Sequence, residues 1–232
     1  MTKKRKDAEQ HGSDLLENPE ALAQQISRTE LFIEKNKTLV SIVLGIVAVA
    51  IAGFVFGRYY VDNQNESAQR DMFQAVYYFE SDSLGLALNG DGNNYGFLEI
   101  IDNYGMTEAA NIASYYAGAT YLKLGDFDNA LKYLKDFSAS DYLIQSRTYS
   151  LIGDAYMEKG QFGEAASQYE KAAAHNANDQ FSPTYLMKAA IANEKAGSTK
   201  DALDNYKSIV KDYNKSAVYQ DAVKHVARLQ GI

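Results

Sequence analysis

A polar segment that begins at residue 91 comes nearest to a metal-binding pattern in this sequence. Asp91, Asn93, Gly96 and Asp102 occupy positions 1, 3, 6 and 12 of the calcium-loop template, in which carboxylate and amide oxygens surround the cation. Position 5 is Tyr95, which departs from that template. We therefore interpret this segment as a loop that connects two helices, and we expect no metal site.

The sequence contains few of the residue types and motifs that other kinds of catalysis require. The chain has no Cys, which excludes thiol nucleophiles, disulfides and thiolate metal ligands. His175 ends a predicted helix, where a cation is favoured, and His225 lies on the last predicted helix. Neither has another His or Cys nearby. The sequence also lacks a phosphate-binding glycine motif, a nucleophile elbow and a supported pair of acids. We expect a protein that is not an enzyme and holds no cofactor.

The net charge of −7 is unevenly distributed along the chain. Up to Lys37, seven Lys and Arg residues balance seven Asp and Glu residues, so the surplus of acid lies entirely in the later part. Nucleic acid needs clustered cations to neutralise its phosphates. An acidic domain of this kind argues against a nucleic-acid partner.

One apolar segment is long enough to cross a bilayer. Thr38–Phe56 contains nineteen residues without a charge, which as a helix spans about 28 Å, close to the hydrocarbon thickness of a membrane. A cleavable signal peptide is the rival interpretation, because Ala48-Val49-Ala50 imitates a cleavage site. The preceding segment is too long for a signal peptide, and the apolar run continues past those alanines. We predict an uncleaved single-pass transmembrane helix at residues 38–57.

Charge around this span predicts its orientation. Lys and Arg cluster before it, whereas only Arg58 and Arg70 follow shortly after, which places the N-terminus in the cytoplasm. We therefore expect the C-terminal domain in the periplasm and the span in the bacterial inner membrane. Small residues along the span could let another transmembrane helix approach closely, although packing against lipid explains them equally well. They are Gly45, Ala48, Ala52, Gly53 and Gly57.

The later part of the chain repeats itself at a fixed period. Gly118 and Gly153 are 35 residues apart, and Ala190 follows 37 residues later. Each unit then has a turn glycine, a small residue and, four positions on, a large residue: Gly125, Ala130 and Leu134; Gly160, Ala165 and Tyr169; Gly197, Ala202 and Tyr206. This order matches the tetratricopeptide pattern of paired helices, although its Trp and late Pro are replaced. An all-α helical solenoid is predicted.

The predicted organisation has six parts. They are a disordered cytoplasmic tail at 1–18, a cytoplasmic or interfacial helix at 19–37, the span at 38–57, periplasmic helices at 58–106, three degenerate repeats at 107–214 and a capping helix at 215–232. Local signals add detail. Thr107, Asp126 and Ser182 are candidate N-caps, with Pro183 at the opening position of a helix. Helices are expected at Gln64–Ser81, around Phe97–Ile101 and, as a possible continuation into the span, over residues 19–36.

In such repeats the first helices of the pairs line the concave face. The residues that we expect there as a protein-binding groove are Ile112, Tyr115, Ala119, Leu122, Arg147, Ser150, Asp154, Met157, Thr184, Met187, Ile191 and Glu194. This face mixes apolar and acidic groups and has little of the cationic clustering that would bind a peptide carboxylate. Coverage of the same face by neighbouring helices is an equally open alternative.

The combination of RTELFIEKNK, one span, DSLGLALNGDG, ASYYAGATYLKLGDFDNALKYL and LIGDAYMEKGQFGEAASQYEKAA resembles membrane-anchored tetratricopeptide proteins of the Bacteroidota envelope. That family is similar to the YfgM-like ancillary subunits of the Sec translocon. The resemblance implies a non-catalytic periplasmic domain that works with the Sec translocon and a PpiD-like prolyl isomerase on emerging polypeptides. A scaffold in outer-membrane assembly or protein export machinery is the alternative.

Overall fold

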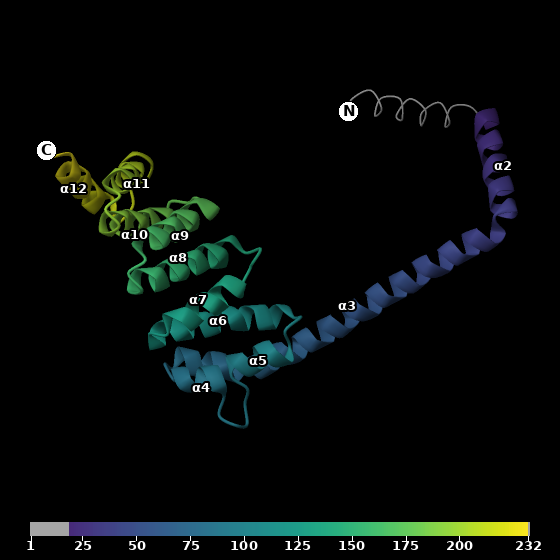
Figure 1. Cartoon of the computed structure of the whole chain (residues 1–232), viewed down its shortest axis with the longest axis horizontal. Coiled ribbons are helices and arrows are strands. Elements are labelled where there is room, and N and C mark those ends of the chain that lie inside the picture. The colour runs from purple at the N-terminus through teal and green to yellow at the C-terminus, as the bar shows by residue number, and fades with distance from the viewer. Residues whose placement is uncertain (1–18, 232) are drawn as a thin grey trace. The chain divides into compact units, whose positions relative to one another are not determined.

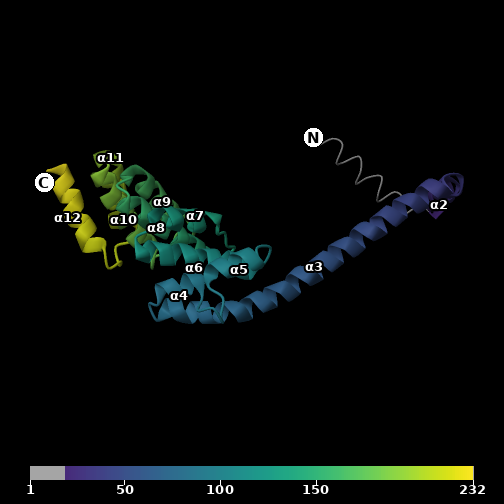
Figure 2. The same ribbon diagram turned by 60° about the horizontal axis from the view of Figure 1, so that its bottom comes forward.

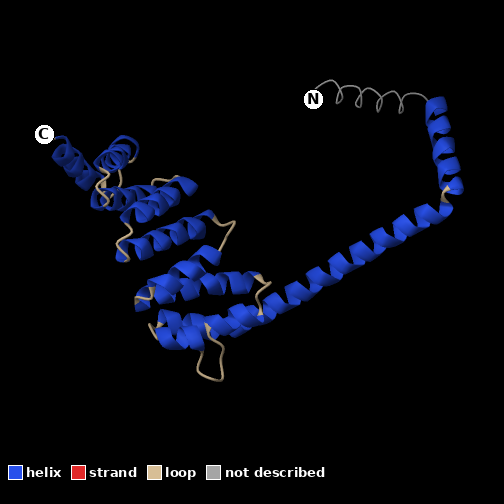
Figure 3. Cartoon of the chain, viewed as in Figure 1, coloured by secondary structure: helices blue, strands red, loops and turns tan. Residues whose placement is uncertain are grey.

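The computed structural model describes residues 19–231, which form helices joined by turns. Eleven helices, α2 to α12, make up this part of the chain, and it contains no strand (Figures 1 and 3). The predicted all-α fold class is confirmed. The predicted disordered tail at 1–18 lies outside the described residues. The chain divides into two units, Met1–Tyr60 and Val61–Ile232, and each is described by itself.

The first unit contains α2, Pro19–Lys35, and the beginning of α3, Lys37–Glu80. The two helices are separate, so the lead-in helix ends before the span instead of continuing into it. A turn at Asn36 divides them. The side-chain amide of Asn36 donates to the Phe32 carbonyl at 2.9 Å, and the carbonyl of Asn36 accepts from Val40 N at 2.9 Å. Asn36 therefore marks the end of α2 and the start of α3.

Among the described helices, α3 alone is long and apolar enough to cross a membrane. Its side chains at 41–60 are all exposed, including Leu44 at 63% and Phe54 at 69%. A helix in the core of a soluble protein would bury part of such a surface. The sequence predicted two helices here, the span and Gln64–Ser81, and the structure corrects this to one continuous helix. No Pro interrupts the sequence between them, so nothing removes a backbone hydrogen bond.

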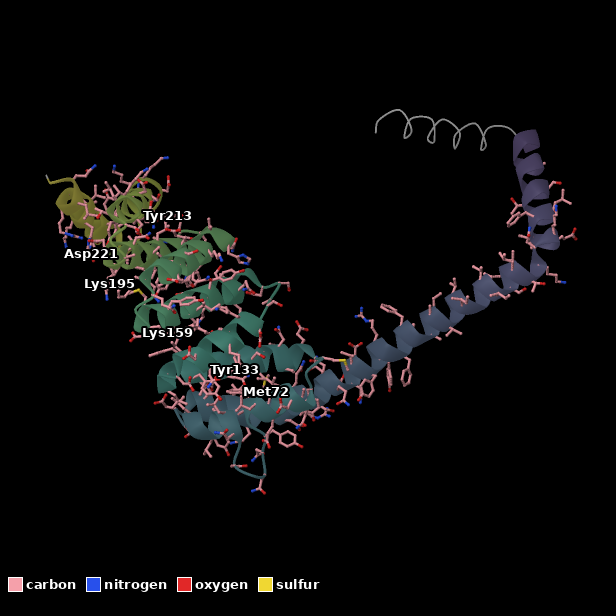
Figure 4. The ribbon with its side chains drawn as sticks, in the orientation of Figure 1. Met72, Tyr133, Lys159, Lys195, Tyr213 and Asp221 are labelled. Atoms are coloured by element: carbon pink, nitrogen blue, oxygen red, sulfur yellow. The ribbon has the colours of Figure 1, made fainter. Side chains whose placement is uncertain are left out.

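In the second unit, the later part of α3 packs with α4, Leu84–Asn89, and α5, Phe97–Asn103. The ring of Phe97 stacks on Tyr116 with centroids 5.2 Å apart. Asn65 Oδ1 accepts from Ala109 N at 2.9 Å. Met72 and Tyr133, labelled in Figure 4, join the same apolar cluster from α3 and α7. This end of the stack is therefore covered by α3, α4 and α5. The short α4 was not predicted.

Three helix pairs follow one another in chain order (Figures 1 and 2). They are α6 and α7, Glu108–Leu124 and Phe127–Asp136; α8 and α9, Tyr142–Glu158 and Phe162–His175; and α10 and α11, Ser182–Lys195 and Thr199–Asp212. The turn glycines Gly125, Gly160 and Gly197 have φ values of 79°, 71° and 78°, a left-handed conformation that side chains disfavour. The glycine spacing in the sequence thus marks the turn within each pair.

The small residue in each first helix lets the second helix approach closely. A Cβ added to Gly118 would lie 2.6 Å from Cγ of Leu134. In the third pair, Ala190 and Tyr206 occupy the corresponding positions and are both fully buried in one cluster. The repeated order of small and large residues in the sequence therefore corresponds to contacts between the two helices of a pair.

Two of the three predicted N-caps are confirmed. Thr107 accepts from Ala110 N at 3.1 Å, and Asp126 accepts from Asn129 N at 3.2 Å. Ser182 is not the cap but the first residue of α10. Its hydroxyl accepts from Asn178 N at 2.9 Å and donates to the Ala173 carbonyl at 2.9 Å, so it joins α10 to the end of α9.

The chain ends in α12, Tyr219–Gln230. The capping helix was expected over residues 215–232, but residues 214–218 form turns, in which Ser216 N donates to Tyr213 O and Tyr219 N donates to Ser216 O. Its apolar face packs on the third pair, with Ala222 fully buried. Figure 4 labels Tyr213 before this helix and Asp221 on it. The helix covers the last repeat, as a solenoid requires at its end.

Candidate protein-binding groove

The twelve residues predicted to line a groove all lie on the first helices α6, α8 and α10. Their exposure differs widely. Four are exposed (Ile112, Arg147, Thr184 and Ile191), five are partly exposed (Tyr115, Leu122, Asp154, Met157 and Glu194), and three are buried (Ala119, Ser150 and Met187). Neighbouring helices thus cover part of the predicted surface. The binding role of these residues stays a prediction.

Two hollows lie along the accessible part of these helices. The larger has a volume of about 490 Å³, and its walls include Ile112 and Tyr115 of α6 and the linker residue Phe137. The smaller, about 170 Å³, lies between α8 and the start of α10. Ile144 and Arg147 line both hollows, which therefore adjoin along α8. We name this surface the first-helix groove and define it by Ile112, Tyr115, Ile144, Arg147, Phe181 and Tyr185.

Sequence reasoning missed several residues of this groove. Leu143, Ile144 and Phe181 are 51%, 44% and 38% exposed, and each lines the smaller hollow. Leu143 and Ile144 lie one helical turn before Arg147, so extending the predicted face by one turn toward the N-terminus would have included them. Phe181 precedes α10, and its position depends on the loop after α9, which has no periodic signal.

Arg147 lies between two phenols that come from different repeats. Burial raises the pKa of Tyr115 and of Tyr185, and the nearby Arg147 guanidinium offsets part of that rise in both. The raised pKa keeps both hydroxyls protonated at neutral pH, and they are therefore potential hydrogen-bond donors. Within residues 19–231, Arg147 has no ion pair, and neither phenol hydroxyl has a hydrogen-bond partner.

Asp154 instead has partners from two neighbouring helices. It accepts a hydrogen bond from the Tyr169 hydroxyl of α9 at 2.6 Å and pairs with Lys188 of α10 at 2.9 Å. Lys188 also donates to Ser150 Oγ at 3.3 Å. Burial, together with the Asp154 carboxylate, raises the pKa of Tyr169 far above its ordinary value. This polar cluster joins the second and third pairs and leaves Lys188 neutralised.

Glu194 is similarly engaged at the end of the stack. Arg228 of α12 donates to both of its carboxylate oxygens, at 2.7 and 2.6 Å, and the Tyr206 hydroxyl donates at 2.7 Å. Burial raises the pKa of Glu194, but the hydrogen bonds from Arg228 and Tyr206 outweigh that effect and leave the pKa below its ordinary value. Glu194 therefore holds the capping helix instead of facing the groove.

Asp91 and His175, which the sequence analysis considered as metal ligands, lie outside the first-helix groove. Asp91 accepts hydrogen bonds from the Tyr78 hydroxyl at 2.7 Å and from the backbone N–H groups of Asn93 and Asn94. The carboxylate therefore stabilises its own loop. The His175 ring lies 5.5 Å from the Tyr149 ring, centroid to centroid, and both line another hollow of about 490 Å³, which Lys171 also lines and which shares the linker residue Phe137 with the larger hollow of the groove. The described residues include no group of three His, Cys, Asp or Glu residues placed to hold a metal.

The small residues predicted for transmembrane packing all lie on α3 and are exposed: Gly45, Ala48, Ala52, Gly53 and Gly57. A Cβ added at any of the three glycines would meet no other atom within 4 Å. No other described part of the chain covers these residues, and packing of a second helix against them stays a prediction.

Two family models, both described as tetratricopeptide repeat, match this chain. One matches residues 113–140, within α6, α7 and the linker that follows. The other matches residues 150–217, from the middle of α8 to the turns before α12. No curated protein matches the chain. The chain therefore contains tetratricopeptide repeats, which are characteristic of protein–protein interaction modules.

Proposed function

We propose that this protein is a membrane-anchored, non-catalytic interaction module whose first-helix groove binds an extended segment of a partner polypeptide. The observation that carries the proposal is the pair of adjoining hollows on α6, α8 and α10, bordered by exposed apolar side chains. Ile112, Ile144 and Phe181 are 37%, 44% and 38% exposed there. Apolar side chains in adjacent hollows suit alternate side chains of a bound chain.

The α3 helix supplies the proposed anchor. Its apolar segment begins directly after Lys35 and Lys37, and further cations lie at Lys3, Lys4, Arg5 and Lys6. This distribution supports an N-terminus in the cytoplasm and a repeat domain in the periplasm, at the bacterial inner membrane. The groove would then lie where polypeptides leave the membrane.

The finer assignment is an ancillary subunit of the Sec translocon that works with a PpiD-like prolyl isomerase on emerging polypeptides. It is supported by the resemblance of the sequence to YfgM-like proteins, by the orientation just described and by the acidic repeat domain. A groove with apolar hollows is also suited to segments that have not yet folded, because their apolar side chains are still accessible.

Affinity purification from native membranes tests this proposal. The full chain, with a C-terminal tag, is compared with Ile144→Asp, which places a charge between the two hollows. Val223→Asp is the matched control, because Val223 is 37% exposed on α12 and lines neither hollow. The translocon channel and a prolyl isomerase should copurify with the wild type and with the control, and be reduced with Ile144→Asp.

Two results would contradict parts of the proposal. Outer-membrane assembly or export components in place of the translocon would favour the scaffold alternative. Equal recovery of the same partners with Ile144→Asp and Val223→Asp would mean that the groove is not the binding surface.

A further inference from the structure

The first-helix groove contains an unpaired cation at its centre. Arg147 lines both hollows, and among the described residues that form their walls it is the only Lys or Arg. An ion pair between an exposed arginine and a single surface carboxylate usually contributes little free energy. Here the exposed guanidinium has partly exposed phenols near it, Tyr115 and Tyr185, on the two neighbouring first helices.

The three side chains come from three successive repeats. Tyr115 lies on α6, Arg147 on α8 and Tyr185 on α10. Arg147 offers a planar set of N–H donors, and each protonated phenol offers one O–H donor. In the described chain none of these groups has an acceptor. Three donors without acceptors, which line adjoining hollows, suit an anionic ligand.

We infer that Arg147, with Tyr115 and Tyr185, binds a carboxylate of the polypeptide in the groove, so that the groove selects segments with an acidic side chain between apolar ones. The inference rests on the proposed function and specifies the chemistry of its ligand. The adjoining hollows lie on either side of Arg147, where Ile112 and Phe137 border one and Leu143 and Phe181 border the other. They would take the apolar neighbours of the acidic residue.

The acidic groups of the groove do not occupy this position. Asp141 accepts hydrogen bonds from the backbone N–H groups of Leu143 and Ile144, as the N-cap of α8. Glu108 lies seven residues before Tyr115, about 10 Å along the axis of α6. The next charged pair, Asp154 with Lys188, neutralises itself. No carboxylate of the described lining therefore forms an ion pair with Arg147.

Matched peptides test the inference on the full chain in lipid nanodiscs. The probes are fluorescent acetyl-Gly-Leu-Glu-Leu-Gly-amide and the same peptide with Gln in place of Glu, and fluorescence anisotropy gives both dissociation constants. The Glu peptide should bind about three- to tenfold more tightly, as expected for a partly shielded charged contact. This ratio should fall as ionic strength rises.

Protein variants show which residues produce the preference for the Glu peptide over the Gln peptide. Arg147→Gln should bring the ratio of the two dissociation constants close to one, and Tyr115→Phe or Tyr185→Phe, which remove only a hydroxyl, should lower it partway. Arg70→Gln is the control, because it removes the same charge from the exposed Arg70 of α3 outside the groove. Its ratio should equal that of the wild type.

The outcomes separate the two proposals. If both peptides bind equally well to the wild type and Ile144→Asp weakens both, the carboxylate inference is wrong and the groove remains a polypeptide-binding site. If the Glu preference survives Arg147→Gln, the carboxylate binds elsewhere and the inference is also overturned. If neither peptide binds, the proposed function fails and the inference fails with it.

Discussion

Gly153 of α8 lies against the ring of Tyr169 of α9. A Cβ added to Gly153 would be 2.6 Å from Cε1 of that ring, closer than packed side chains allow. The ring cannot move away easily, because Tyr169 is 3% exposed and its hydroxyl is bonded to Asp154 at 2.6 Å. The close approach of the two helices in this repeat therefore depends on the missing side chain at residue 153.

Gly153→Ala should lower the free energy of unfolding by about 1–3 kcal/mol, the usual cost of overpacking a core. Gly163→Ala is the control, since Gly163 lies exposed on α9 and an added Cβ would meet nothing within 4 Å. That control should be neutral or raise stability by up to about 1 kcal/mol, because Ala favours a helix more than Gly does. Denaturant unfolding of both variants measures the difference, and equal stabilities would contradict the packing described.

Arg228→Gln should loosen the capping helix. The change removes the two hydrogen bonds from Arg228 of α12 to the Glu194 carboxylate of α10 and leaves Nδ1 of His225, on the same helix, 3.4 Å from that carboxylate. Amide hydrogen exchange should then become faster in α12 and stay unchanged in α8, because local opening depends on local contacts. Lys224→Gln is the control, since it breaks only an exposed pair with Asp221 inside α12. Equal exchange in the two variants would show that Arg228 does not hold the helix.

Asp91 should make the loop at 90–96 sensitive to acid. Hydrogen bonds from the Tyr78 hydroxyl and from the backbone of Asn94 and Asn93 hold the pKa of Asp91 well below its ordinary value. A lowered pKa in the folded state stabilises the protein above the unfolded-state pKa of about 3.9, and this contribution disappears as the pH falls through the folded-state pKa.

Asp91→Asn should therefore have a lower Tm than the wild type at pH 7, and the difference should shrink below about pH 4. Asp102→Asn changes the same charge on α5, where the described structure shows no hydrogen bond to the Asp102 carboxylate. That control should keep the wild-type Tm at pH 7. A difference for Asp91→Asn that persists unchanged at low pH would contradict the role of its charge.

The absence of Cys makes the proposed orientation directly measurable. Single substitutions Glu30→Cys on α2 and Asn93→Cys in the loop after α4 place one thiol on each side of the apolar segment. With a membrane-impermeant maleimide, intact spheroplasts should label Asn93→Cys at once and Glu30→Cys only after permeabilisation. The reverse pattern would invert the proposed orientation, and labelling of both would argue against a single span.

The paired helices could be predicted because the relevant signals are local. Gly125, Gly160 and Gly197 mark turns that need a left-handed backbone, and small and large residues recur at positions that meet within a pair. The continuous α3 could not be predicted from those signals. Its later part is held by tertiary packing, in which Ala68 and Ala75 are completely buried, and a propensity pattern does not contain that information.

The groove was only partly predictable for a related reason. Helical spacing identifies which residues share a face, but exposure depends on how the next repeat packs. Met187 belongs to the buried cluster that joins α10 to α11 and α12, and Glu194 pairs with Arg228, whereas Ile144 remains accessible. Ser182 illustrates the same limit, because its hydroxyl finds partners on both sides of a loop instead of capping its own helix.

Site-specific photo-crosslinking in native membranes tests most directly whether the first-helix groove binds polypeptides. A photoreactive residue replaces Ile144 in the groove or, as the control, Lys171 of α9, which lines neither hollow of the groove. Irradiation should give polypeptide adducts from residue 144 and few from residue 171, with the adducts at 144 reduced in the Arg147→Gln background. Equal adducts from both positions, or adducts from residue 171 alone, would contradict the groove as the binding surface.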